Sequence, residues 1–303
     1  MLKKVAMLAV GLSAVCAIGT ANAQADQEKA TAGDGNTRVE QAQTTPAAQP
    51  AAPETSPAMP APEEKPKWNA PFGGSWAATF TFITDYSYRG ISQTQRQVAF
   101  QAAVGYETPT VSEKVPLSAY VGVWGSSLYF PNTPTWGEID LLAGLKLKLL
   151  DDKLLFDLGY TRYNYLGAPA DLFYDFNEYS LLVGYDFGVA SVTGAVRYSP
   201  SFFANSGVAW YKWGQISVPL NFIKLGDDFA FKLYGTIGNQ YVNLFTNYGI
   251  GQQNYWDWQV GLTATVYGFD LTVAYVDTNL DIANCGNTQN CQARAIFSVS
   301  KTF

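Results

Sequence analysis

The stretch that decides the fold is the end of the chain, RAIFSVSKTF (294–303). Side chains of a β-strand point alternately to its two faces, so residues two apart share a face. One face is apolar and carries Ala295, Phe297, Val299 and Phe303. The opposite face carries Arg294, Ser298, Ser300 and Thr302. Lys301 is an exception, since it falls on the apolar face. An amphipathic strand that closes the chain on an aromatic residue is typical of bacterial outer-membrane β-barrels. We predict that Phe297, Val299 and Phe303 form the signal that the barrel-assembly machinery reads.

Residues 1–23 have the form of a secretory signal peptide. Lys3 and Lys4 precede an apolar stretch, 5–19, and small residues at 21–23 provide a cleavage site after Ala23. About 15 apolar residues are too few to span a bilayer comfortably. A lipoprotein signal is also excluded, because bulky Val15 precedes Cys16. The sequence therefore predicts export.

Residues 24–73 are rich in Ala, Pro, Gln, Glu and Thr and contain few large apolar side chains. Such a segment cannot bury enough apolar surface to offset the entropy of ordering, so we predict a disordered periplasmic linker. It serves either as a plain spacer or as a tether that contacts peptidoglycan or a periplasmic protein.

Residues 74–303 are predicted to form an all-β domain, a transmembrane antiparallel up-and-down β-barrel of about 12 strands. The alternation of apolar and polar residues runs for ten or more positions, which is longer than the five or six residues of an ordinary soluble strand. Tilted by about 40°, ten residues rise roughly 25 Å, the height of the apolar band of a membrane barrel. The predicted strands are 76–89, 95–106, 117–129, 138–149, 153–165, 177–187, 189–198, 207–219, 229–240, 255–266, 269–279 and 292–303.

The connections between these segments alternate between tight turns and long loops. The links at 150–152, 188 and 267–268 are short, whereas 166–175, 241–254 and 280–291 are long. An even number of strands places both ends of the chain on the side of the short turns, the periplasmic side of such barrels. Closure leaves no sheet edge exposed to lipid. We therefore predict that the protein lies in the bacterial outer membrane, in contact with its lipid.

Composition excludes several kinds of function. The 19 Lys and Arg residues are outnumbered by 25 Asp and Glu, and no basic cluster is present, which argues against nucleic acid as a partner. The chain contains no histidine, so nucleophilic catalysis with a His base and His-based metal sites are excluded. Glu138 and Asp140 could in principle carry out acid–base chemistry, but two carboxylates on one strand face are more simply a polar lining. We predict no enzymatic activity, no cofactor and no metal.

Two cysteines remain after removal of the signal peptide. Cys285 and Cys291 are separated by Gly, Asn, Thr and Gln residues that predict a loop. In an oxidising compartment we expect them to form a disulfide. The alternative, a metal site, would fall short of four ligands, because no His or further Cys lies nearby.

Several motifs of the chain resemble the TorF-type porin family, a set of conserved hypothetical proteins labelled for their glycine, cysteine and tryptophan residues. The similarity is carried by GSWAATFTFITDYSYRGISQT (74–94), YVGVWGSSLYF (120–130), EIDLLAGLKL (138–147), GFDLTVAYVDTNL (268–280) and FSVSKTF (297–303). It covers 75–303 and leaves out the linker; the insertion near 108–116 is longer than the family pattern. The resemblance implies an outer-membrane barrel of porin type, without a defined substrate.

The face opposite the apolar set should line the lumen, because a Lys or Arg that faces lipid at the bilayer midplane costs about 2–4 kcal/mol. The predicted lining residues carry both charge signs, which predicts no strong ion selectivity. They are Asp85, Arg89, Glu138, Asp140, Lys146, Lys148, Asp157, Arg197, Lys232, Asp270 and Arg294. Arg89 has two interpretations: it grips an anionic ligand with its two guanidinium nitrogens, or it pairs across strands at the tip of a hairpin near the rim.

The function predicted from the sequence is a narrow channel for passive diffusion of small hydrophilic solutes. Barrels of about eight strands are filled by side chains and those of 16–18 strands enclose a channel, so twelve strands leave little room. The alternative is a structural barrel that links the outer membrane to peptidoglycan or to a periplasmic partner through residues 24–73.

Overall fold

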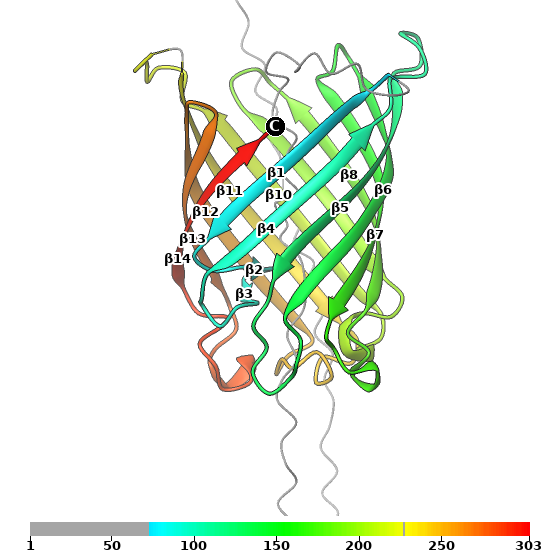
Figure 1. Cartoon of the computed structure of the whole chain (residues 1–303), viewed down its shortest axis with the longest axis vertical. Helices are drawn as coiled ribbons and strands as arrows, with labels where there is room; N and C mark the ends of the chain where they lie inside the picture. The colour runs from blue at the N-terminus through cyan, green and yellow to red at the C-terminus, as the bar shows by residue number, and fades with distance from the viewer. Residues whose placement is uncertain (1–72, 227) are drawn as a thin grey trace, which may run out of the picture. The chain divides into compact units, whose positions relative to one another are not determined.

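The computed structural model of the chain describes residues 73–226 and 228–303. The predicted signal peptide lies outside the described residues, as does the predicted linker apart from Gly73. The described chain forms a closed barrel of twelve antiparallel strands, which confirms the predicted fold class (Figure 1). The strands of the wall are β1 (Ser75–Ile83), β4 (Ala99–Glu107), β5 (Leu117–Ser127), β6 (Gly137–Leu149), β7 (Leu154–Leu166), β8 (Phe176–Asp186), β9 (Ser191–Ser199), β10 (Ala209–Pro219), β11 (Phe229–Val242), β12 (Asn254–Val266), β13 (Phe269–Thr278) and β14 (Arg294–Thr302).

Each wall strand pairs with its neighbours in the sequence, and β1 closes the barrel by pairing with β14. The described N-terminal end of β1 and the C-terminus lie at the end of the barrel that carries the short turns, as predicted (Figure 1). The long loops lie at the opposite end. They contain three short 3₁₀ turns, Ala170–Leu172, Phe203–Asn205 and Ala283–Cys285. None of the helical turns in the described part of the chain is long and apolar enough to cross a bilayer.

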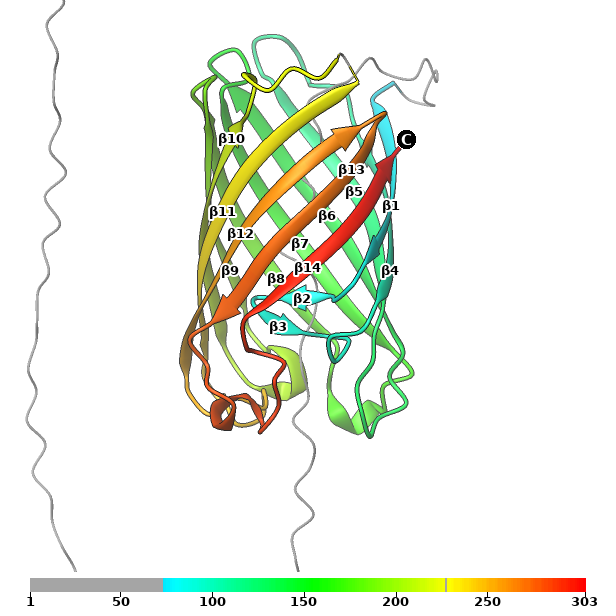
Figure 2. The same cartoon turned by 90° about the vertical axis from the view of Figure 1, so that its left-hand side faces the viewer.

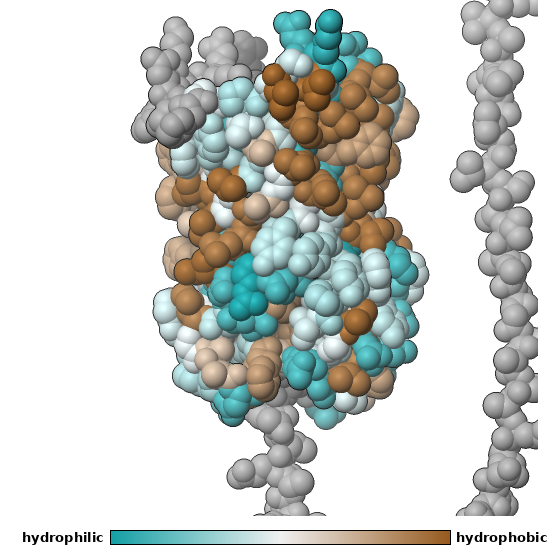
Figure 3. Space-filling view, turned by 90° about the vertical axis from the view of Figure 1, so that its right-hand side faces the viewer, coloured by the Kyte–Doolittle hydropathy of each residue, from teal (hydrophilic) through white to brown (hydrophobic). Residues whose placement is uncertain are grey.

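The strand alternation divides the wall into an apolar outer face and a polar inner face. On β14, Phe297 and Val299 are exposed on the outside, while Ser298 and Ser300 point inward. Figure 3 shows one side of the barrel, where hydrophobic residues gather over the upper and middle part and hydrophilic residues over the end with the long loops. This distribution suits a wall surrounded by acyl chains.

Several glycines of the inner face make room for a tyrosine ring. The ring of Tyr120 on β5 lies across Gly144 on β6, its register partner, and its hydroxyl donates to Asp157 Oδ1 at 2.9 Å. A Cβ added at Gly144 would collide with the Tyr120 ring and would lie 2.6 Å from the carbonyl oxygen of Leu158. Gly261 accommodates Tyr234 in the same way. These pairs fix the packing between neighbouring strands.

We expect Gly144→Val to destabilise the barrel by about 1–3 kcal/mol, since overpacking forces a backbone shift or displaces Tyr120. The free energy of unfolding is measured in urea with the protein refolded into vesicles. Gly184→Val is the matched control, because it also faces inward and the nearest atom to an added Cβ is 3.5 Å away. An equal loss of stability in both variants would contradict a specific role for the Tyr120–Gly144 pair.

Residues 84–98 correct one prediction from the sequence. The sequence predicted that the first strand continues to residue 89 and that the second begins at 95, but β1 ends at Ile83 and β4 begins at Ala99. The residues between them leave the wall and fold into the barrel as a small hairpin, β2 (Ser87–Tyr88) and β3 (Ile91–Ser92) (Figure 2). Arg89 (φ 47°) and Gly90 (φ 81°) form its turn in the left-handed region that favours glycine. We call residues 84–98 the plug segment.

Candidate functional site

The plug segment lies inside the barrel at the end with the long loops, where most side chains between residues 85 and 94 are almost completely buried. Tyr86, Tyr88 and Ile91 are each at most 1% exposed. Backbone hydrogen bonds attach the segment to two loops: the amide of Ser92 donates to Asn290 O (2.9 Å), and Gln93 O accepts from the amide of Tyr129 (3.1 Å). The amide of Thr84 also donates to Phe297 O of β14 (2.9 Å), which ties the start of the segment to the wall. Side chains provide the other connections.

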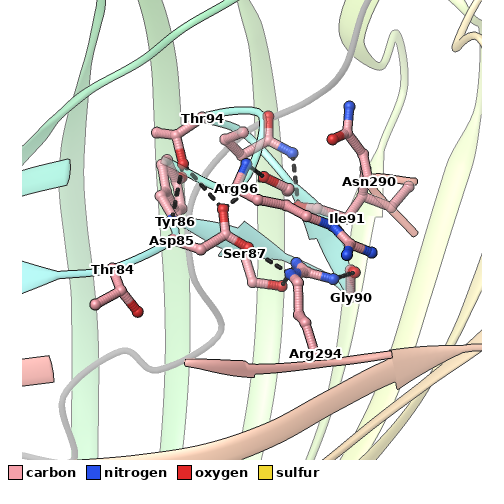
Figure 4. A network of polar contacts seen from close by, with 12 residues as sticks. Thr84, Asp85, Tyr86, Ser87, Gly90, Ile91, Thr94, Arg96, Asn290 and Arg294 are labelled. Atoms are coloured by element: carbon pink, nitrogen blue, oxygen red, sulfur yellow. Dashed lines mark hydrogen bonds and ion pairs between the residues drawn. The ribbon is translucent and has the colours of Figure 1, made fainter. Parts of the chain in front are cut away.

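Asp85 organises the part of the plug segment next to β1, which we call its root. Its Oδ1 accepts hydrogen bonds from Ser92 Oγ and from Thr94 Oγ1 (2.9 Å), and its Oδ2 pairs with Arg294 Nε of β14 (Figure 4). Arg294 also donates to Gly90 O at 2.9 Å, so one guanidinium holds both the root and the turn of the hairpin. The two charged side chains are nearly buried, which makes their hydrogen bonds strong and their loss costly.

Arg89 connects the tip of the plug segment to the far side of the barrel. Its Nη2 donates to both carboxylate oxygens of Glu178 on β8, each at 2.8 Å, and its Nη1 donates to Gln240 Oε1 on β11. The guanidinium carbon lies 4.4 Å and 4.3 Å from the ring centroids of Tyr88 and Tyr211, within the range of cation–π attraction. The Arg89 side chain is fully buried. One residue of the plug therefore bridges two separate strands of the wall.

Tyrosine hydroxyls and carboxylates fill the same layer of the lumen. Tyr86 donates to Glu138 Oε2 (3.0 Å), Tyr163 donates to Glu178 Oε2 (2.9 Å), and Tyr211 donates to both oxygens of Asp257 (3.1 Å each). Burial, reinforced by the nearby Glu138 carboxylate, raises the pKa of Tyr86 well above its ordinary value. The phenol therefore remains protonated and is a donor at every physiological pH.

An aromatic cluster covers this polar layer on the side of the long loops. Phe202 packs edge-on against Phe176 (ring centroids 4.7 Å apart), and Phe203 stacks on Tyr174 (4.3 Å). The disulfide predicted between Cys285 and Cys291 is present, and both cysteines are buried against the cluster. With the plug segment in place, the described side chains exclude solvent from this end of the lumen.

All eleven predicted lining residues lie on the inner face or inside the barrel, in two groups. Those in or beside the buried layer are Asp85, Arg89, Glu138, Asp140, Arg197 and Arg294. Those nearer the short turns are Lys146, Lys148, Asp157, Lys232 and Asp270. The second group remains partly open to solvent; Lys146, for example, forms an ion pair with Glu107 at 2.8 Å. Whether these residues line a conducting pore stays a prediction.

The sequence suggested two roles for Arg89, binding of an anionic ligand or pairing across strands near the rim. The contacts of Arg89 change both. The guanidinium is engaged by Glu178 and Gln240 in the resting structure, so a ligand would have to displace them. Arg89 does sit at a hairpin tip, but its ionic partner comes from across the lumen and the pair is buried, not at the rim. Glu178, Gln240, Tyr211 and Asp257 were not among the eleven lining residues predicted from the sequence. The signal that could have found them is that each lies on the inward-facing side of its strand.

The site offers ion pairs and hydrogen bonds rather than metal ligation. Within residues 73–226 and 228–303, no group of three or more Asp, Glu or Cys side chains is arranged to hold a metal ion. Arg89 and Arg294 pair with Glu178 and Asp85, whereas Glu138 and Asp140 lie beside each other on the inner face of β6. Chemically, the arrangement can contact hydrophilic solutes and can hold the plug segment in place.

Comparison with solved structures yields low similarities of the barrel to outer-membrane proteins. The NanC porin has a TM-score of 0.42 at 10% identity, over 75% of this chain and 98% of that chain. LpxR from Salmonella typhimurium has a TM-score of 0.41 at 9% identity, over 75% and 99%. An outer-membrane channel from Pseudomonas putida F1 has a TM-score of 0.39 at 10% identity, over 76% and 96%. Values this low carry no information on function.

The search of curated proteins finds no match. The family comparison is more decisive, because residues 69–303 match the model described as "Bacterial protein of unknown function (Gcw_chp)". The match covers the whole barrel, including the plug segment and the Cys285–Cys291 loop. The TorF-type label is narrower than this match and stays a prediction. The chain belongs to the Gcw_chp family of bacterial proteins.

Proposed function

We propose that the protein is an outer-membrane channel through which small hydrophilic solutes diffuse passively, and that the plug segment closes it. The observation that carries this proposal is the attachment of the plug. The obstruction is one segment of 15 residues, 84–98, held by side-chain pairs and by a few backbone hydrogen bonds, and the wall around it is continuous without it. A segment bound through Arg89 and Asp85 can leave the lumen while every wall strand stays paired.

The half of the lumen beyond the plug supports passage of hydrophilic solutes. Its inner face carries hydroxyls and charged groups of both signs, such as Lys146, Asp157 and Thr263. Mixed charges lower the barrier for polar solutes of either sign, so selectivity would come from width more than from charge. Tyr120 and Tyr234 project into this region and narrow it.

The proposal is tested by single-channel recording on the mature chain in planar bilayers, with and without a salt gradient. We expect a predominantly closed state with rare openings. Lys146→Gln should shift the reversal potential toward cation preference, because Glu107 loses its positive partner and contributes a net negative charge. Lys212→Gln is the matched control, since Lys212 lies on the outer face of β10, where its register partners are Asn239 on β11 and Val196 on β9. No openings in the wild type or in any plug variant would contradict the channel.

The sealed layer also favours a second candidate, a structural barrel that ties the outer membrane to peptidoglycan or a periplasmic partner through residues 24–73. A barrel used for attachment gains from a filled interior, and Tyr86, Tyr88 and Arg89 fill it. Deletion of 24–73 separates the two functions. A channel keeps its conductance without the linker, whereas a tether loses its co-sedimentation with peptidoglycan.

A further inference from the structure

The outer wall of the barrel carries a shallow apolar groove between β14, β1, β4 and β5. Its volume is about 690 Å³. Phe80, Phe82, Phe100 and Val104 lie along it as exposed side chains. Ala102 and Gly125, register partners on β4 and β5, leave its floor low because they carry little or no side chain. The groove is continuous with the apolar surface of the wall, so its natural occupant is a hydrocarbon chain.

Lys301 lies at one end of this groove and is the lysine that breaks the apolar pattern of the last strand. It faces outward, between its register partners Phe80 on β1 and Phe269 on β13. The side chain lies over the Phe269 ring, with Nζ 4.9 Å from the centroid, and the ammonium donates to Tyr267 O in the adjoining short turn at 3.3 Å. Within the part of the chain that the structure describes, no carboxylate pairs with this ammonium.

The apolar methylene chain of Lys301 lies along the wall, and its ammonium reaches toward the turn. A lysine on a membrane protein adopts this conformation to bring its charge to the membrane surface. An unpaired cation at that depth complements a phosphate ester. The short turns mark the periplasmic end of such barrels, so the groove faces the leaflet of phospholipids. The apolar groove and the cation at its end together match the two parts of one lipid, the acyl chains and the headgroup.

We propose that the groove and Lys301 form a binding site for one anionic phospholipid, with an acyl chain over Ala102 and Gly125 and the headgroup phosphate at Lys301 Nζ. An anionic headgroup is favoured over a zwitterionic one, since phosphatidylethanolamine carries its own ammonium, which competes with Lys301 for the phosphate. The inference rests on the membrane location assumed in the proposed function.

Native mass spectrometry of the detergent-purified protein, titrated with phosphatidylglycerol or phosphatidylethanolamine, tests the site. We expect one tightly retained phosphatidylglycerol, and about tenfold weaker binding in Lys301→Gln, as loss of a charge-assisted hydrogen bond predicts. Ala102→Phe should abolish retention by filling the groove. Lys212→Gln, which removes an outward lysine elsewhere, should bind as the wild type does. Inorganic phosphate should not compete, because it lacks the acyl chain.

Undiminished retention in Lys301→Gln, or equal loss in Lys212→Gln, would overturn the proposal. If Ala102→Phe fails to fold, as shown by loss of the heat-dependent shift in gel mobility, Lys301→Gln decides the matter alone. The channel proposal is tested by a different measurement, because its failure would appear as absent conductance in bilayers and not as lost lipid binding. Lys301→Gln lies outside the lumen and should conduct as the wild type does.

Discussion

Arg89→Ala is expected to convert the resting barrel from predominantly closed to predominantly open. The substitution removes the buried contact between the plug tip and Glu178, and it also removes the hydrogen bond to Gln240. Glu178 then keeps the Tyr163 hydroxyl (2.9 Å) and the more distant Arg197 guanidinium (3.9 Å) but loses its close cationic partner. Breaking a buried ion pair by removing one member costs about 3–5 kcal/mol when the remaining charge is uncompensated, and Arg197 lowers that cost. Entry of water beside Glu178 relieves this cost, and water enters when the plug moves.

Single-channel recording measures the open fraction directly, and the Glu178→Gln variant provides a second test of the cause. If the loss of the close cationic partner of Glu178 drives opening, the double variant Arg89→Ala/Glu178→Gln should be closed more often than Arg89→Ala. Arg162→Ala is the control, because Arg162 pairs with Asp175 at 3.2 Å and the two side chains are 34% and 44% exposed. Exposed pairs contribute about 0–1 kcal/mol. Equal open fractions in Arg89→Ala and Arg162→Ala would mean that the Arg89 contact does not hold the plug.

The architecture of the wall was predictable because strand parity is a local property. Alternation along 294–303 and the earlier segments separates the two faces without knowledge of the partners, and the surrounding lipid enforces it at each position. The same rule assigned Arg197 and Lys232 to the inside. It also identified Lys301 as an exception, although only its position beside Phe269 and the turn at Tyr267 gives that lysine a use.

The plug segment was not predictable from the same signal. Tyr86 and Tyr88 continue the period of two from β1, so the pattern reads as a longer strand. A hairpin inside the lumen alternates its side chains every second residue, as a strand of the wall does, so the pattern cannot tell them apart. The hairpin is instead held in place by partners distant in sequence: Glu178 lies 89 residues from Arg89, and Arg294 lies 209 residues from Asp85. Such pairings depend on the closed barrel, and no local property of residues 84–98 specifies them.

Asp85→Ala should have a larger structural effect than Arg89→Ala, because it removes the root of the plug and not only its tip. Arg294 loses its buried carboxylate and the Ser92 hydroxyl loses its acceptor, whereas the Thr94 hydroxyl can still donate to Gln97 O at 2.6 Å. The guanidinium left without its carboxylate accounts for about 3–5 kcal/mol, and the Ser92 hydroxyl adds about 1–3 kcal/mol if it stays buried and unsatisfied. This exceeds what the two-residue strands β2 and β3 provide, so the plug segment should unfold as a unit while the wall persists.

Limited trypsin digestion measures this unfolding, because the plug segment carries two cleavage sites of its own, Arg89 and Arg96. In the wild type Arg89 is buried, so we expect slow cleavage there. In Asp85→Ala both sites should be cut rapidly, and the cut barrel should keep its mobility shift on heating because each wall strand remains paired. Asp152→Ala, in the exposed turn between β6 and β7, serves as the control.

In Arg89→Ala the root stays bonded to Arg294, so the rate of cleavage at Arg96 should lie between those of the wild type and of Asp85→Ala. If Arg96 is cut no faster in Asp85→Ala than in Asp152→Ala, the Asp85–Arg294 pair does not anchor the plug, and the loop contacts of Ser92 and Gln93 must hold it instead.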